Sequence, residues 1–124
     1  MAMLATIAAV VLTCTPLAID GDTLRCGAER IRLLGIDAPE MPGHCHKPRI
    51  CVDGDPYASK ASLADALRAG PYVIRRVGTD RYGRTLATVT AQGKDLSCAQ
   101  LRAGSAIYVD KWDNGHLVAD SCPN

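Results

Sequence analysis

The chain has 124 residues, of which 48% are hydrophobic and 22% are charged. This size and composition fit one globular domain and exclude collagen, long coiled coils and intrinsic disorder. Fourteen Lys and Arg residues against 13 Asp and Glu give a net charge of +1, so any polyanion that the protein binds must meet a local cluster of cations.

The N-terminal segment, residues 2–12, is apolar apart from Thr6. It is too short to span a bilayer, which takes about 20 residues. It has the length of a signal-peptide core, although no Lys or Arg precedes it and no clear cleavage site follows. The alternative is that residues 8–12 begin the first strand. We favour a shortened export signal, because the cysteine content also indicates export.

Three short segments rich in β-forming residues come next, at residues 15–19, 23–26 and 30–35. Glycines separate them, which is typical of a meander of strands. In the third segment polar and apolar residues alternate, so Ile31 and Leu33 are expected to face the core, with Arg32 on the opposite face.

Residues 41–54 contain several Pro and Gly residues and are expected to form a long loop. His44, Cys45, His46 and Cys51 offer four zinc ligands, but adjacent residues rarely all point at one ion. The short spacing of the two cysteines also suits a small disulfide loop. We favour the disulfide.

A helix is predicted over residues 56–69, because Pro56 suits a first helical position and Gly70 suits the residue after a helix end. Strands are expected at residues 72–77 and 85–91, joined by a loop. Ser97 is expected to cap a second helix that ends at Gly104, and residues 107–109 form a last strand. This order favours a small closed barrel with helices packed on it.

Six cysteines in a chain of this length indicate three disulfides and an oxidising, extracytoplasmic compartment. The sequence alone leaves several pairings open. We expect local pairing, which joins Cys14 to Cys26, Cys45 to Cys51, and Cys98 to Cys122.

Acidic residues cluster in two segments at predicted strand ends, Asp20–Thr23 and Ile36–Glu40. Each segment alone is also typical of an ordinary turn or a solvated loop. Asp22 and Asp37 could nevertheless share one divalent cation such as Ca²⁺, with a backbone carbonyl and waters completing its coordination.

A third polar segment, Asp80–Arg84, contains a glycine that allows a tight turn and ends on an arginine. The three segments together provide acids for a metal and a base, and Arg32 and Arg84 for an anion. Phosphodiester hydrolysis needs this set, because attack on phosphorus develops negative charge that cations stabilise while a metal aligns the water.

These segments resemble the staphylococcal nuclease-like (thermonuclease) domain family. The similar stretches are Asp20–Thr23, Ile31–Glu40 and Asp80–Ala87, within a similarity from about Leu17 to about Tyr108. The resemblance implies a mainly β fold, an OB-type five-stranded barrel with two to three α-helices. We therefore assign residues 1–13 to an export signal or a lead-in to the first strand, and residues 14–124 to a single nuclease-like domain.

The resemblance also implies roles for individual residues. Glu40 would activate the attacking water, and Arg32 and Arg84 would bind the phosphate as catalytic residues. Tyr82 would contact a nucleotide phosphate, and Arg81 is placed with it in the substrate-binding segment.

The metal site implied by the resemblance uses Asp22, Asp37 and the backbone carbonyl of Ala38 as Ca²⁺ ligands, with Asp20 supporting them from just outside. The best-known members have Thr at the position of Ala38, a difference that is harmless if only the carbonyl binds.

We therefore expect a monomeric, Ca²⁺-dependent nuclease that acts on DNA and RNA. We place it outside the cytoplasm, secreted or periplasmic, and free of the membrane once processed. The alternative is a non-catalytic OB-type module that binds nucleic acid or protein. A binding module has no need for the complete set of acids and arginines, so we favour the nuclease.

Overall fold

The computed structural model describes residues 8–122. Its strands are β1 (Ala9–Val11), β2 (Leu17–Ala18), β3 (Thr23–Cys26), β4 (Glu29–Leu33), β5 (Ile36–Asp37), β6 (Tyr72–Thr79), β7 (Thr85–Ala91), β8 (Lys94–Asp95) and β9 (Ile107–Tyr108). The helices are α1 (Pro56–Ala66), α2 (Leu96–Arg102) and α3 (Leu117–Ser121), with 3₁₀ turns η1 (Asp110–Trp112) and η2 (Asn114–His116).

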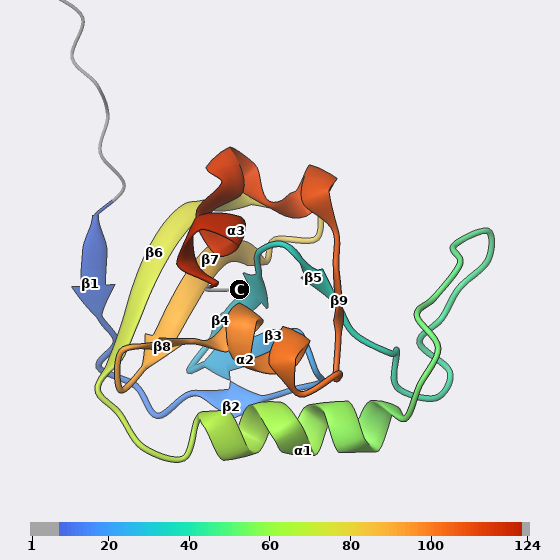
Figure 1. Cartoon of the computed structure of the whole chain (residues 1–124), viewed down its shortest axis with the longest axis horizontal. Helices are drawn as coiled ribbons and strands as arrows, with labels where there is room; N and C mark the ends of the chain where they lie inside the picture. Colours follow the sequence, from blue (N-terminus) through green and yellow to red (C-terminus); the bar gives the residue numbers. More distant parts are fainter. Residues whose placement is uncertain (1–7, 123–124) are drawn as a thin grey trace, which may run out of the picture.

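Among residues 8–122 the strands form a seven-stranded sheet in the order β1-β6-β7-β4-β3-β2, with β8 paired to β7, and a separate pair of β5 and β9 (Figure 1). The mainly β prediction is confirmed, but the sheet does not close into a barrel. Gly35, with φ at +75°, turns the chain after β4. As a result β5 leaves the large sheet and pairs with β9.

The centre of the core comes from β4 and β7, which run parallel to each other. Ile31 and Leu33 are buried, as the alternation in β4 predicts. Ala87 and Val89 on β7 and Leu63 on α1 are buried in the same core cluster. The pairing of β4 with the first residues of β7 brings Arg32, on β4, near Arg84, which directly precedes β7.

The two longer helices start at aspartate caps. Asp55 accepts hydrogen bonds from two backbone N–H groups of α1, and Pro56 is the first helical residue, as predicted. The prediction that Ser97 caps α2 is wrong, because Asp95 performs this role by accepting from the Cys98 N–H at 2.9 Å. The Ser97 hydroxyl instead donates to the Leu34 carbonyl and ties α2 to the end of β4.

The first described strand, β1, pairs antiparallel with β6. Residues 9–11 therefore form a strand, which was the alternative to an export signal for this segment. Residues 1–7 of the proposed signal lie outside the described residues. Within residues 8–122, every helix is too short or too polar to span a bilayer.

Three disulfides join the cysteine pairs expected from the sequence: Cys14–Cys26, Cys45–Cys51 and Cys98–Cys122. The Cys45–Cys51 bond uses both sulfur atoms that a zinc site in this loop would need. The structure therefore has the disulfide and not the zinc site. Three disulfides are typical of proteins in oxidising compartments.

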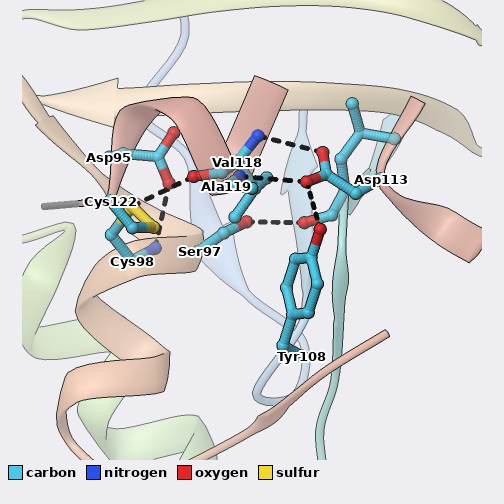
Figure 2. Close-up of a disulfide and its surroundings, with 9 residues drawn as sticks. Asp95, Ser97, Cys98, Tyr108, Asp113, Val118, Ala119 and Cys122 are labelled. Carbon is cyan, nitrogen blue, oxygen red and sulfur yellow. Dashed lines mark hydrogen bonds between the residues drawn. A yellow bond between two sulfur atoms is a disulfide. The ribbon is translucent and has the colours of Figure 1, made fainter. Parts of the chain in front are cut away.

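Asp113 organises the C-terminal end next to the Cys98–Cys122 disulfide (Figure 2). Its carboxylate accepts hydrogen bonds from the Tyr108 hydroxyl at 2.7 Å and from the N–H groups of Val118 and Ala119 at 2.9 and 3.0 Å. Burial opposes ionisation of Asp113, but these hydrogen bonds outweigh it and lower the pKa. The network fixes α3 against the residues that follow β9.

Candidate active site

The turn Asp20–Asp22 connects β2 to β3 and lies against α1. A Cβ atom on Gly21 would meet the Ser59 hydroxyl at 1.8 Å, so this position requires glycine. Gln100 on α2 is fully buried and donates to the Gly21 carbonyl at 2.8 Å and to the Ser59 carbonyl at 2.9 Å. Packing against two helices therefore fixes the backbone of the turn that carries Asp20 and Asp22.

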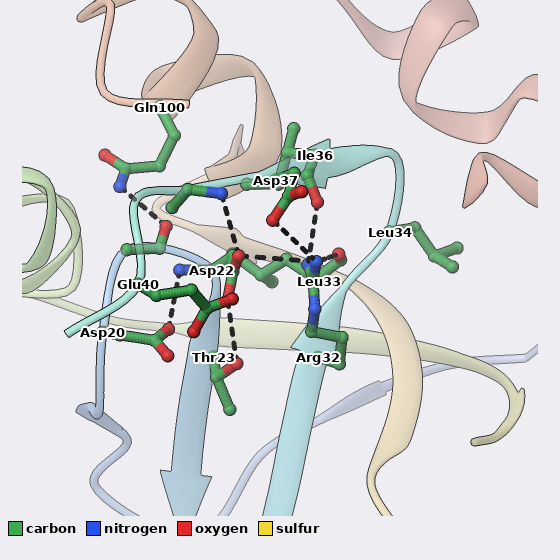
Figure 3. A network of polar contacts seen from close by, with 12 residues as sticks. Asp20, Asp22, Thr23, Arg32, Leu33, Leu34, Ile36, Asp37, Glu40 and Gln100 are labelled. Atoms are coloured by element: carbon green, nitrogen blue, oxygen red, sulfur yellow. Dashed lines mark hydrogen bonds and ion pairs between the residues drawn. The ribbon is translucent and has the colours of Figure 1, made fainter. Parts of the chain in front are cut away.

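Asp22 links this turn to the second acidic segment (Figure 3). Its Oδ2 accepts a hydrogen bond from the Ala38 N–H at 2.9 Å, and its Oδ1 accepts one from the Thr23 hydroxyl at 3.0 Å. The bond to Ala38 holds the end of β5 beside the start of β3. Asp22 and Asp37 are thereby brought to the same place, although they are far apart in the sequence.

Arg32 lies between these two acids. Its Nη2 is 3.4 Å from Asp22 and 3.7 Å from Asp37, and its Nη1 donates to the Leu33 and Ile36 carbonyls at 3.0 and 2.8 Å. The guanidinium also lies over the Trp112 ring, 5.4 Å from its centroid. The Arg32 guanidinium is thus buried and held in one orientation by these contacts, and it belongs to the candidate site.

Glu40 follows the second acidic segment and is paired with an arginine that the sequence analysis did not assign. Arg49, from the loop at residues 41–54, donates through Nη1 to Glu40 at 2.6 Å and through Nη2 to Asp37 at 2.9 Å. Partial burial lowers the pKa of Arg49, but the Asp37 carboxylate and then Glu40 outweigh this and raise it.

The third segment forms a tight turn around Asp80. This carboxylate accepts from the backbone N–H groups of Tyr82 and Arg84 at 2.9 Å and from the Arg84 Nε at 2.7 Å. Burial opposes ionisation of Asp80, but the hydrogen bonds from Arg84 outweigh it and lower the pKa. Asp80 therefore orients the Arg84 guanidinium.

Tyr82 at the tip of this turn is 58% exposed. Arg81 donates to its hydroxyl at 2.7 Å and lies over its ring, 4.9 Å from the centroid. Arg30 on β4 donates to the Tyr82 carbonyl and so attaches the turn to the sheet. The turn thus presents an aromatic ring and cations to solvent.

One cleft of about 1030 Å³ is lined by most of the predicted site residues: Asp20, Asp22, Arg32, Glu40, Arg81, Tyr82 and Arg84. Asp37 and Ala38 are buried behind it. The cleft is also lined by Arg30, Arg49, Lys111 and Trp112, which sequence reasoning missed. For Arg49 a signal existed, because residues 41–52 contain basic side chains and no acid.

The donor set fits a hard divalent cation. Carboxylate and carbonyl oxygens are the ligands that Ca²⁺ prefers, and the acids are crowded: burial, followed by repulsion from Asp22, raises the pKa of Asp20 to about 7. A nearby cation would relieve this repulsion. Among residues 8–122, one group of three possible metal ligands has its ligand atoms within 4.8 Å of one another: Asp95, Cys98 and Cys122. Its two cysteines form a disulfide. The acids of the cleft are more widely spaced, with Arg32 and Arg49 between them.

The chain is similar to known proteins. A family model described as "Staphylococcal nuclease homologue" matches residues 30–119. The succinoglycan biosynthesis protein ExoI of Rhizobium meliloti is 35% identical over 111 residues, which are 83% of this chain and 54% of that protein. An uncharacterized endonuclease of Haemophilus influenzae is 33% identical over 110 residues, 85% of this chain and 56% of that protein. The chain spans about half the length of these curated relatives.

Proposed function

Since this chain belongs to the family of staphylococcal nuclease homologues, we propose that it hydrolyses phosphodiester bonds in DNA and RNA with the help of Ca²⁺. The main support is the convergence of sequence-distant groups: Asp22, Arg32, Glu40 and Arg84 all line one cleft. A relative that is named an endonuclease supports the same reaction class. This juxtaposition of acids and arginines suits attack on a phosphodiester better than passive binding of an anion.

The metal would be held by Asp22, Asp37 and the backbone carbonyl of Ala38, with Asp20 behind them. When bound, Ca²⁺ supplies charge neutralisation at the phosphate and alignment of the attacking water. Asp20 accepts the Asp22 N–H at 3.0 Å and so holds the turn in place. Two carboxylates and one carbonyl leave several coordination positions to water, which favours weak binding until a substrate phosphate adds a ligand.

Glu40 would act as the general base. It accepts the proton of a water molecule whose oxygen attacks phosphorus, while the bond from phosphorus to the leaving oxygen breaks. Its side chain is 16% exposed and lines the cleft, so a water molecule and a phosphate can approach it.

The two predicted catalytic arginines would stabilise the negative charge that grows on the phosphoryl oxygens. Carbonyl groups hold Arg32 from behind, and Asp80 holds Arg84. Because both guanidiniums are oriented before substrate arrives, little reorganisation is needed in the transition state. Tyr82 and Arg81 extend the cleft and would contact the adjacent nucleotide.

The biological setting is part of the proposal. The three disulfides favour an oxidising compartment, and we propose that the protein is secreted or periplasmic. We also propose that it acts as a monomer.

A direct assay is digestion of single-stranded DNA and of RNA by the full chain, with Ca²⁺ and with a chelator. We expect cleavage of both substrates with Ca²⁺ and its loss with the chelator. The alternative, a non-catalytic binding module, predicts retention of the oligonucleotide on the protein without cleavage under both conditions.

A further inference from the structure

Arg49 occupies a distinctive place in the candidate site. Its two terminal nitrogens bridge the carboxylates of Asp37 and Glu40 at 2.9 and 2.6 Å. These acids are a proposed metal ligand and the proposed base. A guanidinium and a divalent cation require the same negative charge, so both cannot fully use the same carboxylate oxygens.

Arg49 differs from Arg32, whose ion pairs are with Asp22 and Asp37. Arg32 is buried and directed by two backbone carbonyls, so its position belongs to the fold. The Arg49 side chain is 42% exposed, and its guanidinium is bonded to the two carboxylates alone among residues 8–122. Arg49 can therefore move away without disrupting the core.

The loop that carries Arg49 is closed by the Cys45–Cys51 disulfide. A hydrogen bond from the Arg49 N–H to the His46 carbonyl at 3.1 Å adds a local turn inside this ring. A closed ring limits how far Arg49 can move from the acids, which keeps its effective concentration near them high.

A displaced Arg49 could instead pair with the phosphates of a nucleic acid, because the rest of its loop forms a basic wall of the cleft. His44, His46 and Lys47 line the same cleft, and residues 41–52 contain no acid. The loop wall is therefore basic, and a guanidinium on it would lie beside the phosphates of a nucleic acid in the cleft.

We propose that Arg49 is a tethered counter-ion of the metal site, which competes with a divalent cation for Asp37 and Glu40 and is held in reach by the Cys45–Cys51 ring. The inference rests on the proposed function for the identity of the metal ligands. It adds that the affinity for Ca²⁺ is set by this loop as well as by the ligands.

The test is a calorimetric titration of the full chain with Ca²⁺ alone, without nucleic acid. Arg49→Gln should bind Ca²⁺ about five- to tenfold more tightly than the wild type, because the competing cation is gone. Lys47→Gln is the matched control: it removes a positive charge from the same loop, and Lys47 forms none of the ion pairs found among residues 8–122. Its affinity should stay within about twofold of the wild type. An equal change in both variants, or no tighter binding by Arg49→Gln, overturns the proposal.

The tether is tested by replacing Cys45 and Cys51 with Ser, alone and together with Arg49→Gln. In a protein that keeps Arg49, the Ser replacements should tighten Ca²⁺ binding. In Arg49→Gln they should not change the Ca²⁺ affinity further, because both changes act on the same competing cation. An undiminished effect of the Ser replacements without Arg49 contradicts the tether. Melting temperatures of all variants identify any that fail to fold. Because no substrate is present, a wild type that binds Ca²⁺ but cleaves nothing removes the proposed function and leaves this inference standing.

Discussion

Two aspartates are almost equally buried but are treated very differently by the protein. Asp113, 4% exposed, receives three hydrogen bonds from neutral donors of its own chain. Asp22, 5% exposed, receives two such bonds and lies near Asp20, Asp37 and Glu40.

The difference separates a structural carboxylate from one that lies in the proposed metal site. Around Asp113 the negative charge is satisfied by fixed dipoles, which stabilises the ionised form. Around Asp22 four carboxylates meet two arginines, so negative charge remains. Burial, and then repulsion from Asp22, raise the pKa of Asp20. A buried excess of one charge reduces stability, and an arriving cation would restore it.

The largest expected effect is on the functional side. Glu40→Gln keeps the shape of the side chain but removes the base and one negative charge, so kcat should fall by about 10²-fold or more. Single-turnover cleavage of DNA measures this, with the melting temperature as a check on folding. Glu29→Gln is the control, because Glu29 pairs with Arg76 and Thr85 outside the cleft. A near-normal rate for Glu40→Gln would remove Glu40 from the mechanism.

Replacement of Gln100 should lower both the stability of the fold and the cleavage rate. Gln100→Leu removes the side-chain donor to the Gly21 and Ser59 carbonyls, and we expect a loss of about 2 kcal/mol in unfolding free energy. The rate should also fall, because the Asp20–Asp22 turn loses its anchor. Urea denaturation and cleavage rates are measured together. Ser97→Ala, which removes another buried hydrogen bond of the same helix, should reduce stability and leave the rate unchanged. Equal rates for the two variants would show that Gln100 does not position the site.

The smallest effect is expected at Asp113 and concerns stability alone. Its pKa is lowered on folding, so its contribution is present above the unfolded pKa, about 4, and is lost as pH falls through the lower folded value. Asp113→Asn should cost about 1 to 2 kcal/mol at pH 7 and less at pH 3. Denaturation at both pH values measures this, with Asp110→Asn on the exposed neighbour as the control. A cost that does not change with pH would contradict the role of the ionised carboxylate.

Local chemistry explains which features the sequence could predict. The alternation in β4, the Asp55 and Pro56 start of α1 and the consecutive disulfide pairs depend on residues close in sequence. The family resemblance is correct because its motifs are likewise contiguous. The position of Asp22 and Arg32 in one cleft follows from the same motifs.

The missed features depend on contacts between distant segments. The local sequence indicates a cap at Ser97, but its hydroxyl bonds to Leu34, 63 positions away, which no local pattern shows. The contact of Arg49 with Asp37 depends on a similar long-range fold: the basic character of residues 41–52 indicates an anion partner, but not which acid the loop meets. The open sheet results from the turn at Gly35 and the pairing of β5 with β9, which no local pattern specifies.

The order of the disulfides has a consequence for how the protein matures. The first cysteine pairs with the second, the third with the fourth and the fifth with the sixth, across 12, 6 and 24 positions. A chain that enters an oxidising compartment from its N-terminus can close each ring as soon as the next cysteine arrives. Each closed ring leaves two fewer thiols that could pair wrongly with a later cysteine. If the chain is exported as proposed, pairing in the order of arrival gives the native connectivity.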